Sequence, residues 1–144
     1  MKTYVVDASV AARFLLVEEF DEEAKAVLEG FLEGRHDLLA PPVVVYEVGN
    51  ALRTAVARGE VNAGEAREAF GFFLGLNLGR MVASSDLLGK AFAFSLERGV
   101  SYYDGVYIWS SKSIDATLLT ADDVQIETAK GVVSAIHLKD FKSD

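Results

Sequence analysis

The sequence of 144 residues contains no cysteine and only two histidines. Without cysteine there is no disulfide framework, no thiolate metal site and no cysteine nucleophile. This absence fits a reducing compartment, so we expect a cytoplasmic protein. The longest stretch without a charged residue, positions 69–79, is too short to cross a bilayer, and we expect no membrane association. The amino terminus, where Lys2 leads straight into an apolar segment, does not resemble a signal peptide.

Positive charge is also scarce, since 14 Lys and Arg face 22 Asp and Glu and the net charge is −8. Nucleic-acid-binding proteins are more often basic, because phosphates need counter-charge, so this balance argues against such a partner. The argument weakens if several carboxylates bind divalent cations, which reverse the local sign of the charge. Much of the excess lies at positions 18–23, which we interpret as a solvated turn entering a helix.

Apolar segments with the length of strands alternate with helical segments along the whole chain. Hydrophobic residues make up 51% of the sequence, enough for a packed core, and the length fits a single domain over residues 1–144. We therefore expect an α/β fold, a three-layer α/β/α sandwich with a central parallel sheet. The expected strands lie at 3–6, 38–40, 81–83, 117–119 and 132–136. The expected helices lie at 9–16, 21–32, 41–58, 63–77 (capped by Asn62), 85–98 (capped by Ser85), 103–113 and 123–130.

Two of the expected strands end in acidic residues. Asp7 follows the first strand, and Asp122 follows Leu118-Leu119-Thr120. In an open parallel sheet, ligand chemistry lies beyond the carboxyl ends of the strands. Either Asp could instead simply cap the next helix. The role of Asp123 stays open, because it could cap that helix while Asp122 acts as a ligand.

Two further acids lie in helices. Glu47 is inside the long helix, where capping cannot explain it, on a stripe of small or polar residues with Asn50 and Thr54. It could face a cavity, or it could be an ordinary solvent-facing Glu. Asp104 begins a helix, where the helix dipole stabilises negative charge, but its aromatic neighbours indicate partial burial. A buried carboxylate needs a partner or a metal ion.

Together, the acids Asp7, Glu47, Asp104 and Asp122 predict a site for a hard cation bound through oxygen. Mg²⁺ or Mn²⁺ fits this donor set, and Zn²⁺ fits poorly. A bound metal ion lowers the pKa of water and stabilises charge on a phosphate, so no side-chain nucleophile is required.

Other side chains are candidates for contacts to substrate. The hydroxyls of Ser9 and Thr120 are suited to a water or a phosphate oxygen, or to local turn bonding and helix capping. The candidate phosphate contacts are Arg13, Arg53 and Lys112, and each could equally be ordinary surface charge.

Four segments, VVDASV (5–10), YEVGNAL (46–52), YYDGVY (102–107) and LLTAD (118–122), resemble the PIN-domain ribonucleases of the VapC toxin group. The resemblance covers essentially the whole chain. It implies that the four acids are the metal ligands and catalytic residues and that the substrate is single-stranded RNA, cut to leave a 5′-phosphate. It also implies a VapB-type antitoxin with cationic side chains and a homodimer. Gly105 departs from the family pattern, in which Ala often follows the Tyr-Asp pair.

A protein partner is indicated separately by the helix at 63–77. Ala66, Ala69, Phe70, Phe73 and Leu74 form an expected core stripe. Phe72 and Leu76 widen this stripe. A buried helix end, a dimer surface or an antitoxin surface would each account for the pattern. Tyr103 and Tyr107, at helical spacing in a later helix, are expected in the core and not at an interface.

Other α/β enzymes fit less well. A haloacid-dehalogenase-type enzyme needs a second Asp two residues after the first, where this chain has Ser9. A receiver domain has its acidic pair near the first strand, and the glycine-rich phosphate-binding signatures are absent. A catalytically silent PIN-like module that binds protein or RNA remains the alternative function.

Overall fold

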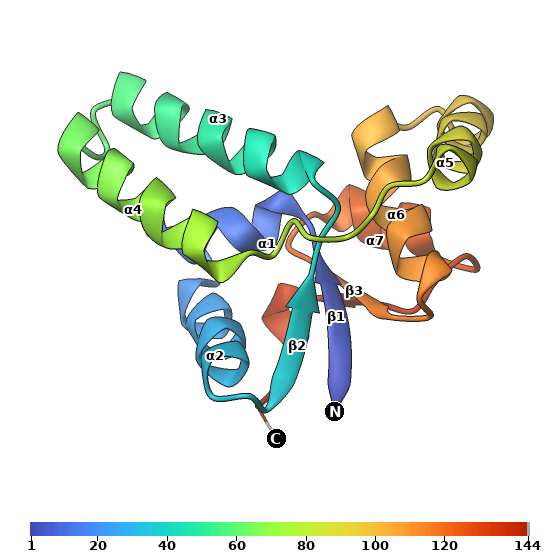
Figure 1. Ribbon diagram of the computed structural model, residues 1–144, viewed down its shortest axis with the longest axis horizontal. Coiled ribbons are helices and arrows are strands. Elements are labelled where there is room, and N and C mark those ends of the chain that lie inside the picture. Colours follow the sequence, from blue (N-terminus) through green and yellow to red (C-terminus); the bar gives the residue numbers. More distant parts are fainter. Residues whose placement is uncertain (144) are drawn as a thin grey trace.

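The computed structural model describes residues 1–143 and has a four-stranded sheet at its centre (Figure 1). The strand order is β2-β1-β3-β4, and all neighbouring strands are parallel. The strands are β1 (Lys2–Val6), β2 (His36–Leu39), β3 (Thr117–Thr120) and β4 (Ala135–His137). The central strand β3 is buried along its whole length and β1 from Tyr4 to Val6, as expected for strands covered by helices on both sides.

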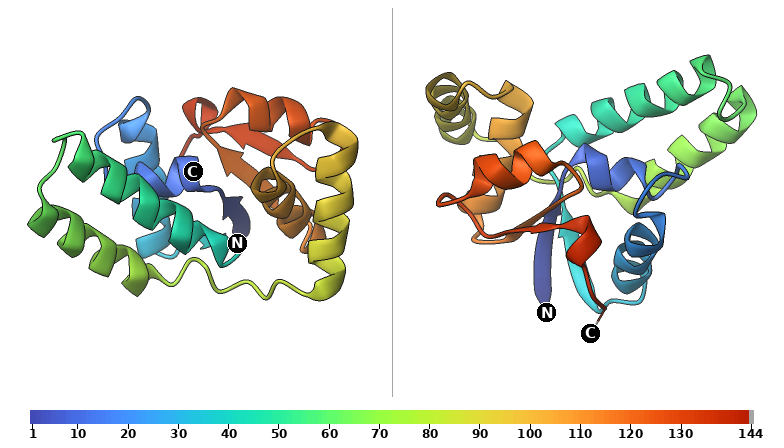
Figure 2. Two further views of the ribbon diagram at one scale, coloured as in Figure 1. Left: turned by 90° about the horizontal axis from the view of Figure 1, so that it is seen from above. Right: turned by 180° about the vertical axis from the view of Figure 1, so that it is seen from behind.

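Helices flank the sheet on two sides. They are α1 (Ala8–Ala12), α2 (Asp21–Leu32), α3 (Val43–Ala57), α4 (Ala63–Leu76), α5 (Ser85–Arg98), α6 (Tyr102–Ser113) and α7 (Asp123–Ala129), with a 3₁₀ turn η1 (Leu138–Asp140). Helices α3 and α4 form an antiparallel hairpin on one side, and α5, α6 and α7 gather on the other (Figures 1 and 2). This arrangement confirms the expected three-layer α/β/α fold. Among the described residues, no helix combines the length and the apolar character needed to span a bilayer.

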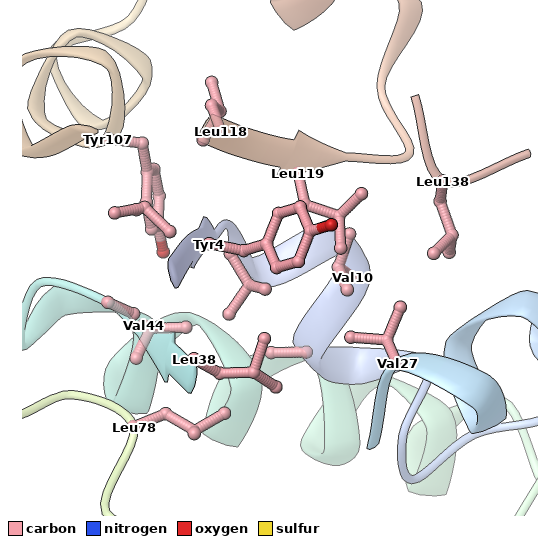
Figure 3. Close-up of a cluster of buried hydrophobic side chains, with 14 of the residues drawn as sticks. Tyr4, Val10, Val27, Leu38, Val44, Leu78, Tyr107, Leu118, Leu119 and Leu138 are labelled. Atoms are coloured by element: carbon pink, nitrogen blue, oxygen red, sulfur yellow. The ribbon is translucent and has the colours of Figure 1, made fainter. Parts of the chain in front are cut away.

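The core joins the sheet to the helices around it. Figure 3 shows side chains from β2, β3, α1, α2 and α3 meeting in one apolar cluster. Leu38, Leu119, Val10, Val27 and Val44 are all completely buried in it. Because this packing holds the strands and the first turn of α1, it also sets the positions of the residues just beyond each strand, at the carboxyl edge of the sheet.

The helix starts are mostly those that the sequence predicted. Asn62 caps α4, with its Oδ1 accepting from the Glu65 N–H at 2.8 Å and Glu65 bonding back at 3.0 Å. The cap of α5 is one residue earlier than expected, because the Ser84 hydroxyl, and not that of Ser85, accepts from the Leu87 N–H at 3.2 Å.

The expected strand at 81–83 is wrong. The Met81 N–H donates to the Ala40 carbonyl at 3.3 Å, but within residues 1–143 the segment joins no ladder, and Val82 is 86% exposed. Arg80 holds this segment instead, through an ion pair of 2.9 Å with Asp37. Three apolar residues were enough for a strand pattern but not for a strand, because among the described residues the backbone of 78–81 bonds only to Ala40, just beyond the end of the edge strand β2, and forms no ladder with that strand.

Smaller differences concern element ends, such as β2 at His36–Leu39 in place of 38–40, and one core residue. The first helix ends at Ala12, and turns follow it where helix was expected as far as position 16. The last strand begins at Ala135, because Gly131 has a φ of 77° and turns the chain before it. Leu74 of α4 is exposed, so its expected place in the core is wrong, and Phe72 is also exposed, on the opposite side of the helix.

Gly105, the departure from the family pattern, has a packing reason. A Cβ atom at this position would lie 2.8 Å from the Ala91 carbonyl oxygen of α5. The glycine therefore lets α5 and α6 approach more closely than an alanine would.

Candidate acidic active site

The carboxyl edge of the sheet brings Asp7 and Thr120 together. Val6 is paired with Leu119 in the parallel ladder, so the next residue of each strand faces the same gap. The Thr120 hydroxyl donates to Asp7 Oδ2 at 2.5 Å, across 113 positions of sequence. Two strand ends thus share one polar centre.

Asp7 is only 5% exposed, and its carboxylate is heavily hydrogen-bonded. Its Oδ1 accepts from the Ser9 N–H at 3.1 Å, the Ser9 hydroxyl at 2.5 Å and the Val10 N–H at 3.3 Å. Burial raises the pKa of Asp7 to about 6, although these bonds oppose the rise, and the nearby Asp104 adds to it. Asp7 therefore caps α1 and is also a desolvated acid with a perturbed pKa.

The hydroxyls of Ser9 and Thr120 hold this acid in place. Ser9 Oγ also accepts from the Ala121 N–H at 2.9 Å, and Thr120 Oγ1 accepts from the Asp122 N–H at 3.1 Å. A hydroxyl has one proton to donate, and in both residues that proton points at Asp7. While Asp7 is ionised, each hydroxyl can accept a bond from a water but has no second proton for a phosphate oxygen.

Glu47 reaches the site from the middle of α3, where it is half-buried. The Tyr107 hydroxyl donates to Glu47 Oε1 at 2.7 Å. Burial raises the pKa of Glu47, with a further contribution from the charge of Asp104. The pKa of Tyr107 is also raised, by burial and then by the charge of Glu47, so Tyr107 stays a neutral donor.

Tyr107 is a site residue that the sequence did not reveal. Its spacing predicted a core side chain, and the ring is indeed buried among apolar residues (Figure 3). Its hydroxyl, however, faces Glu47 and lies close to the charge of Asp7. The available signal was its position three residues after Asp104, which places both on one side of α6. A buried tyrosine usually finds a partner for its hydroxyl.

Asp104 lies in the first turn of α6, which Ser101 caps through a bond of 3.1 Å to the Asp104 N–H. The pKa of Asp104 is raised by burial first and by the charge of Asp122 second. The buried Gln125 of α7 donates from Nε2 to the Asp104 carbonyl at 3.2 Å. Gln125 thus ties the helix that bears Asp104 to the helix that Asp122 caps, and no sequence pattern indicated this role.

Asp123 points elsewhere. Its side chain is exposed and lies 3.4 Å from Nε2 of the buried His137 at the end of β4. His137 Nδ1 accepts from the Lys139 N–H at 3.0 Å, which leaves a proton on Nε2 to face Asp123. Asp122, not Asp123, caps α7, through a bond of 2.9 Å to the Val124 N–H.

Asp104 lies within electrostatic reach of each of the other three acids. The charge of Asp104 raises the pKa of both Asp7 and Glu47, and the charge of Asp122 raises the pKa of Asp104. Within residues 1–143, no three His, Asp or Glu side chains already stand in an arrangement ready to hold a metal ion. The donors are nonetheless all carboxylate oxygens, and their mutual repulsion is what a hard divalent cation relieves.

Within residues 1–143, none of the three candidate cations forms an ion pair with one of the four acids. Arg13 uses its guanidinium on two backbone carbonyls, Ser9 at 2.7 Å and Glu19 at 2.8 Å. Arg53 is exposed on α3, about 9 Å further along the axis than Glu47. Lys112 lies over the Trp109 ring, 5.2 Å from its centroid, about 12 Å along α6 from Asp104.

Comparison with known proteins decides the family. Residues 4–131 match the family described as the PIN domain. The chain belongs to the PIN-domain family. Among curated relatives, it is 33% identical over 122 residues to "Ribonuclease VapC3" of Pyrobaculum aerophilum, covering 82% of this chain and 88% of the relative. It is 32% identical to "Ribonuclease VapC1" of Mycobacterium tuberculosis, covering 69% and 72%. The resemblance to VapC-type PIN domains is thereby confirmed.

Solved structures agree on the fold of this PIN domain. PAE2754 from Pyrobaculum aerophilum has a TM-score of 0.72 at 25% identity and covers 96% of this chain and 92% of its own. FitAcB from Neisseria gonorrhoeae has a TM-score of 0.67 at 17% identity, covering 96% and 99%. VapBC2 from Rickettsia felis, solved with a fragment of promoter DNA, has a TM-score of 0.61 at 12% identity, covering 94% and 98%. The last two show the fold alone.

Proposed function

We propose that this PIN domain is a divalent-metal-dependent endoribonuclease that cuts single-stranded RNA with a metal-activated water. The observation that carries the proposal is the gathering of four acids from separate parts of the chain around Asp104. The names of the curated relatives, which are ribonucleases, support the same activity. The catalytically silent module is the alternative, and it leaves the perturbed carboxylates without a purpose.

Asp7, Glu47, Asp104 and Asp122 are the proposed catalytic residues and ligands of Mg²⁺ or Mn²⁺. The bound ion would lower the pKa of a water and stabilise charge on the scissile phosphate. Because Asp7 has a pKa of about 6 and is fixed by hydrogen bonds, it is ionised at neutral pH and holds one position. Tyr107 orients Glu47 in the same way from the helical side.

The biological setting proposed is a toxin–antitoxin pair in the cytoplasm. The Rickettsia felis structure bears the joint name VapBC2 and the curated relatives are named VapC, and these names support a VapB-type antitoxin as partner. Cationic side chains of such a partner would complement the four acids. The apolar side chain of Phe72 on α4 is 47% exposed, and we propose that this helix face is used in a homodimer or by the antitoxin.

The test is cleavage of a labelled, fully randomised single-stranded RNA pool with Mn²⁺ or Mg²⁺ and with EDTA. The matched control for Asp7→Asn is Asp115→Asn, an exposed acid with a φ of 51° that Asn readily adopts. We expect the native protein and Asp115→Asn to cleave the pool only when metal is present. We expect Asp7→Asn to lose this cleavage. Cleavage that persists in EDTA or in Asp7→Asn, or no cleavage of the pool at all, contradicts the proposal.

A further inference from the structure

A hollow of about 370 Å³ borders Glu47. Val43, Tyr46, Glu47 and Asn50 of α3 line it, together with Tyr103 of α6. Its volume falls within the range of ligand pockets, which begins at about 300 Å³. The two tyrosines are 76% and 54% exposed, so large aromatic surfaces stand open to solvent on its two helices.

The hollow is continuous with the acidic site. Glu47 belongs to both, and Tyr103 immediately precedes Asp104 in α6. A group bound between the two helices would therefore lie directly beside a phosphate bound at the acids. The helical spacing predicted a core position for Tyr103, and its exposure shows that this prediction is wrong.

The charges near the hollow limit what can bind in it. Among the described residues, no Lys or Arg lines it, and Glu47 would repel a phosphate or an acidic peptide. Most nucleic-acid-binding surfaces draw their affinity from phosphate neutralisation, which this surface does not supply. Stacking of bases on aromatic rings is the other common source of affinity for single strands, and it needs no positive charge.

Asn50 adds the means to recognise a base. Its side chain is exposed at the wall of the hollow, and its amide offers two donor hydrogens and one acceptor oxygen. A flat aromatic ligand with mixed donors and acceptors on its edge is what two rings and one amide accommodate. A nucleobase has this chemistry, whereas an aliphatic side chain does not.

We propose that Tyr46 and Tyr103 form a base clamp, which holds the nucleobase next to the cleaved phosphate of a single-stranded RNA, with Asn50 contacting the edge of that base. The base clamp rests on the proposed ribonuclease function and extends it. On this proposal, any preference for RNA sequence at the cleavage site arises from the base clamp and not from the acids.

The experiment uses one RNA that contains a cleavage site found in the randomised pool. A second RNA carries an abasic sugar on one side of the cleaved phosphate, and a third carries it on the other. Tyr46→Leu and Tyr103→Leu are expected to raise KM for the intact RNA about tenfold with little change in kcat. Tyr46→Phe and Tyr103→Phe keep the ring and are expected to keep KM. Phe92→Leu, at a site 54% exposed but outside the hollow, is the matched control and is expected to behave as native.

One of the two abasic RNAs is expected to raise KM for the native protein, and the Leu variants are expected to add nothing further on that RNA. Metal-dependent cleavage with an unchanged KM in both Leu variants overturns the base clamp alone. An equal rise of KM on intact and on abasic RNA in the Leu variants also overturns the base clamp. A change of oligomeric state in light scattering of the Leu variants would assign the hollow to a contact between copies of this chain instead. Absence of cleavage by the native protein overturns the ribonuclease function itself.

Discussion

The strand side and the helix side of the acidic site are built differently. On the strand side, Asp7 is buried and receives hydrogen bonds from Ser9, Val10 and Thr120. On the helix side, Glu47 and Asp104 are half-buried, and Glu47 borders an open hollow. The sheet ladder thus fixes one carboxylate firmly, while the packing of α3 near α6 supplies carboxylates with more freedom. A rigid anchor with adjustable partners suits a site that must take up both a metal ion and a flexible strand.

The strongest test of this contrast is the loss of the anchor. Asp7→Asn keeps the size of the side chain and an oxygen acceptor but removes the charge. We expect cleavage to fall about a thousandfold, because the amide cannot replace a carboxylate as a metal ligand. Initial rates with Mn²⁺ measure the effect against Asp115→Asn. A loss of less than tenfold would show that the strand side is not the anchor.

The pH dependence of stability depends on the same residue. Its folded-state pKa of about 6 lies above the ordinary 3.8, so the folded protein binds the Asp7 proton more tightly than the unfolded chain does. The resulting stabilisation is complete below pH 3.8 and is lost as the pH rises through about 6, by on the order of 3 kcal/mol. Asp7→Asn lacks this titration. Urea unfolding in EDTA from pH 4 to 8 should show native stability falling relative to the variant, and parallel curves would contradict the assignment.

Removing one hydroxyl tests how the anchor is held. Thr120→Val keeps the shape but removes the donor to Asp7 Oδ2 and the acceptor for the Asp122 N–H. We expect a loss of about 1 to 2 kcal/mol in the free energy of unfolding. Cleavage should fall by about tenfold to a hundredfold, since Asp7 and Asp122 both lose a constraint. Thr120→Ser retains the hydroxyl and should stay close to native. Equal behaviour of the two variants would show that the hydroxyl does not hold the anchor.

The smallest expected effect is on the helix side. Tyr107→Phe removes only the hydroxyl that bonds Glu47. We expect about a tenfold loss of cleavage, because Glu47 keeps its charge and loses its orientation. Tyr102→Phe, which removes a hydroxyl with a long contact of 3.4 Å to the Leu88 carbonyl, is the control. A loss of cleavage in Tyr107→Phe as large as the loss in Asp7→Asn would show that the helix side is as rigid as the strand side.

Short strand and helix patterns in the sequence were enough to predict most of the acidic residues of the site. Asp7 and Asp122 could be placed because a strand pattern ends beside each, and Glu47 because helix periodicity put it on a polar stripe. The bond between Asp7 and Thr120 spans 113 positions, and that between Glu47 and Tyr107 spans 60. Such pairs depend on strand order and helix packing, which no short pattern reports.

The predictions that were wrong failed because they also depend on tertiary contacts. The segment 81–83 has the composition of a strand but lies on the surface, and Leu74 follows the core periodicity of α4 but faces solvent. What is missing in both is tertiary: among the described residues no strand forms a ladder with 81–83, and half of the Leu74 side chain stays open to solvent. Gln125 was overlooked for the opposite reason, because its partner is a backbone carbonyl of another helix.

The central claim is that the four acids act as one metal site with Asp104 at its middle. The most direct test is to measure Mn²⁺ binding by calorimetry. A pH of about 7.5 is chosen because Asp7 is ionised there. Native protein and Asp115→Asn should bind alike. Asp104→Asn should weaken binding at least tenfold, because it removes the charge that reaches both Asp7 and Glu47. Unchanged Mn²⁺ affinity in Asp104→Asn would contradict the account.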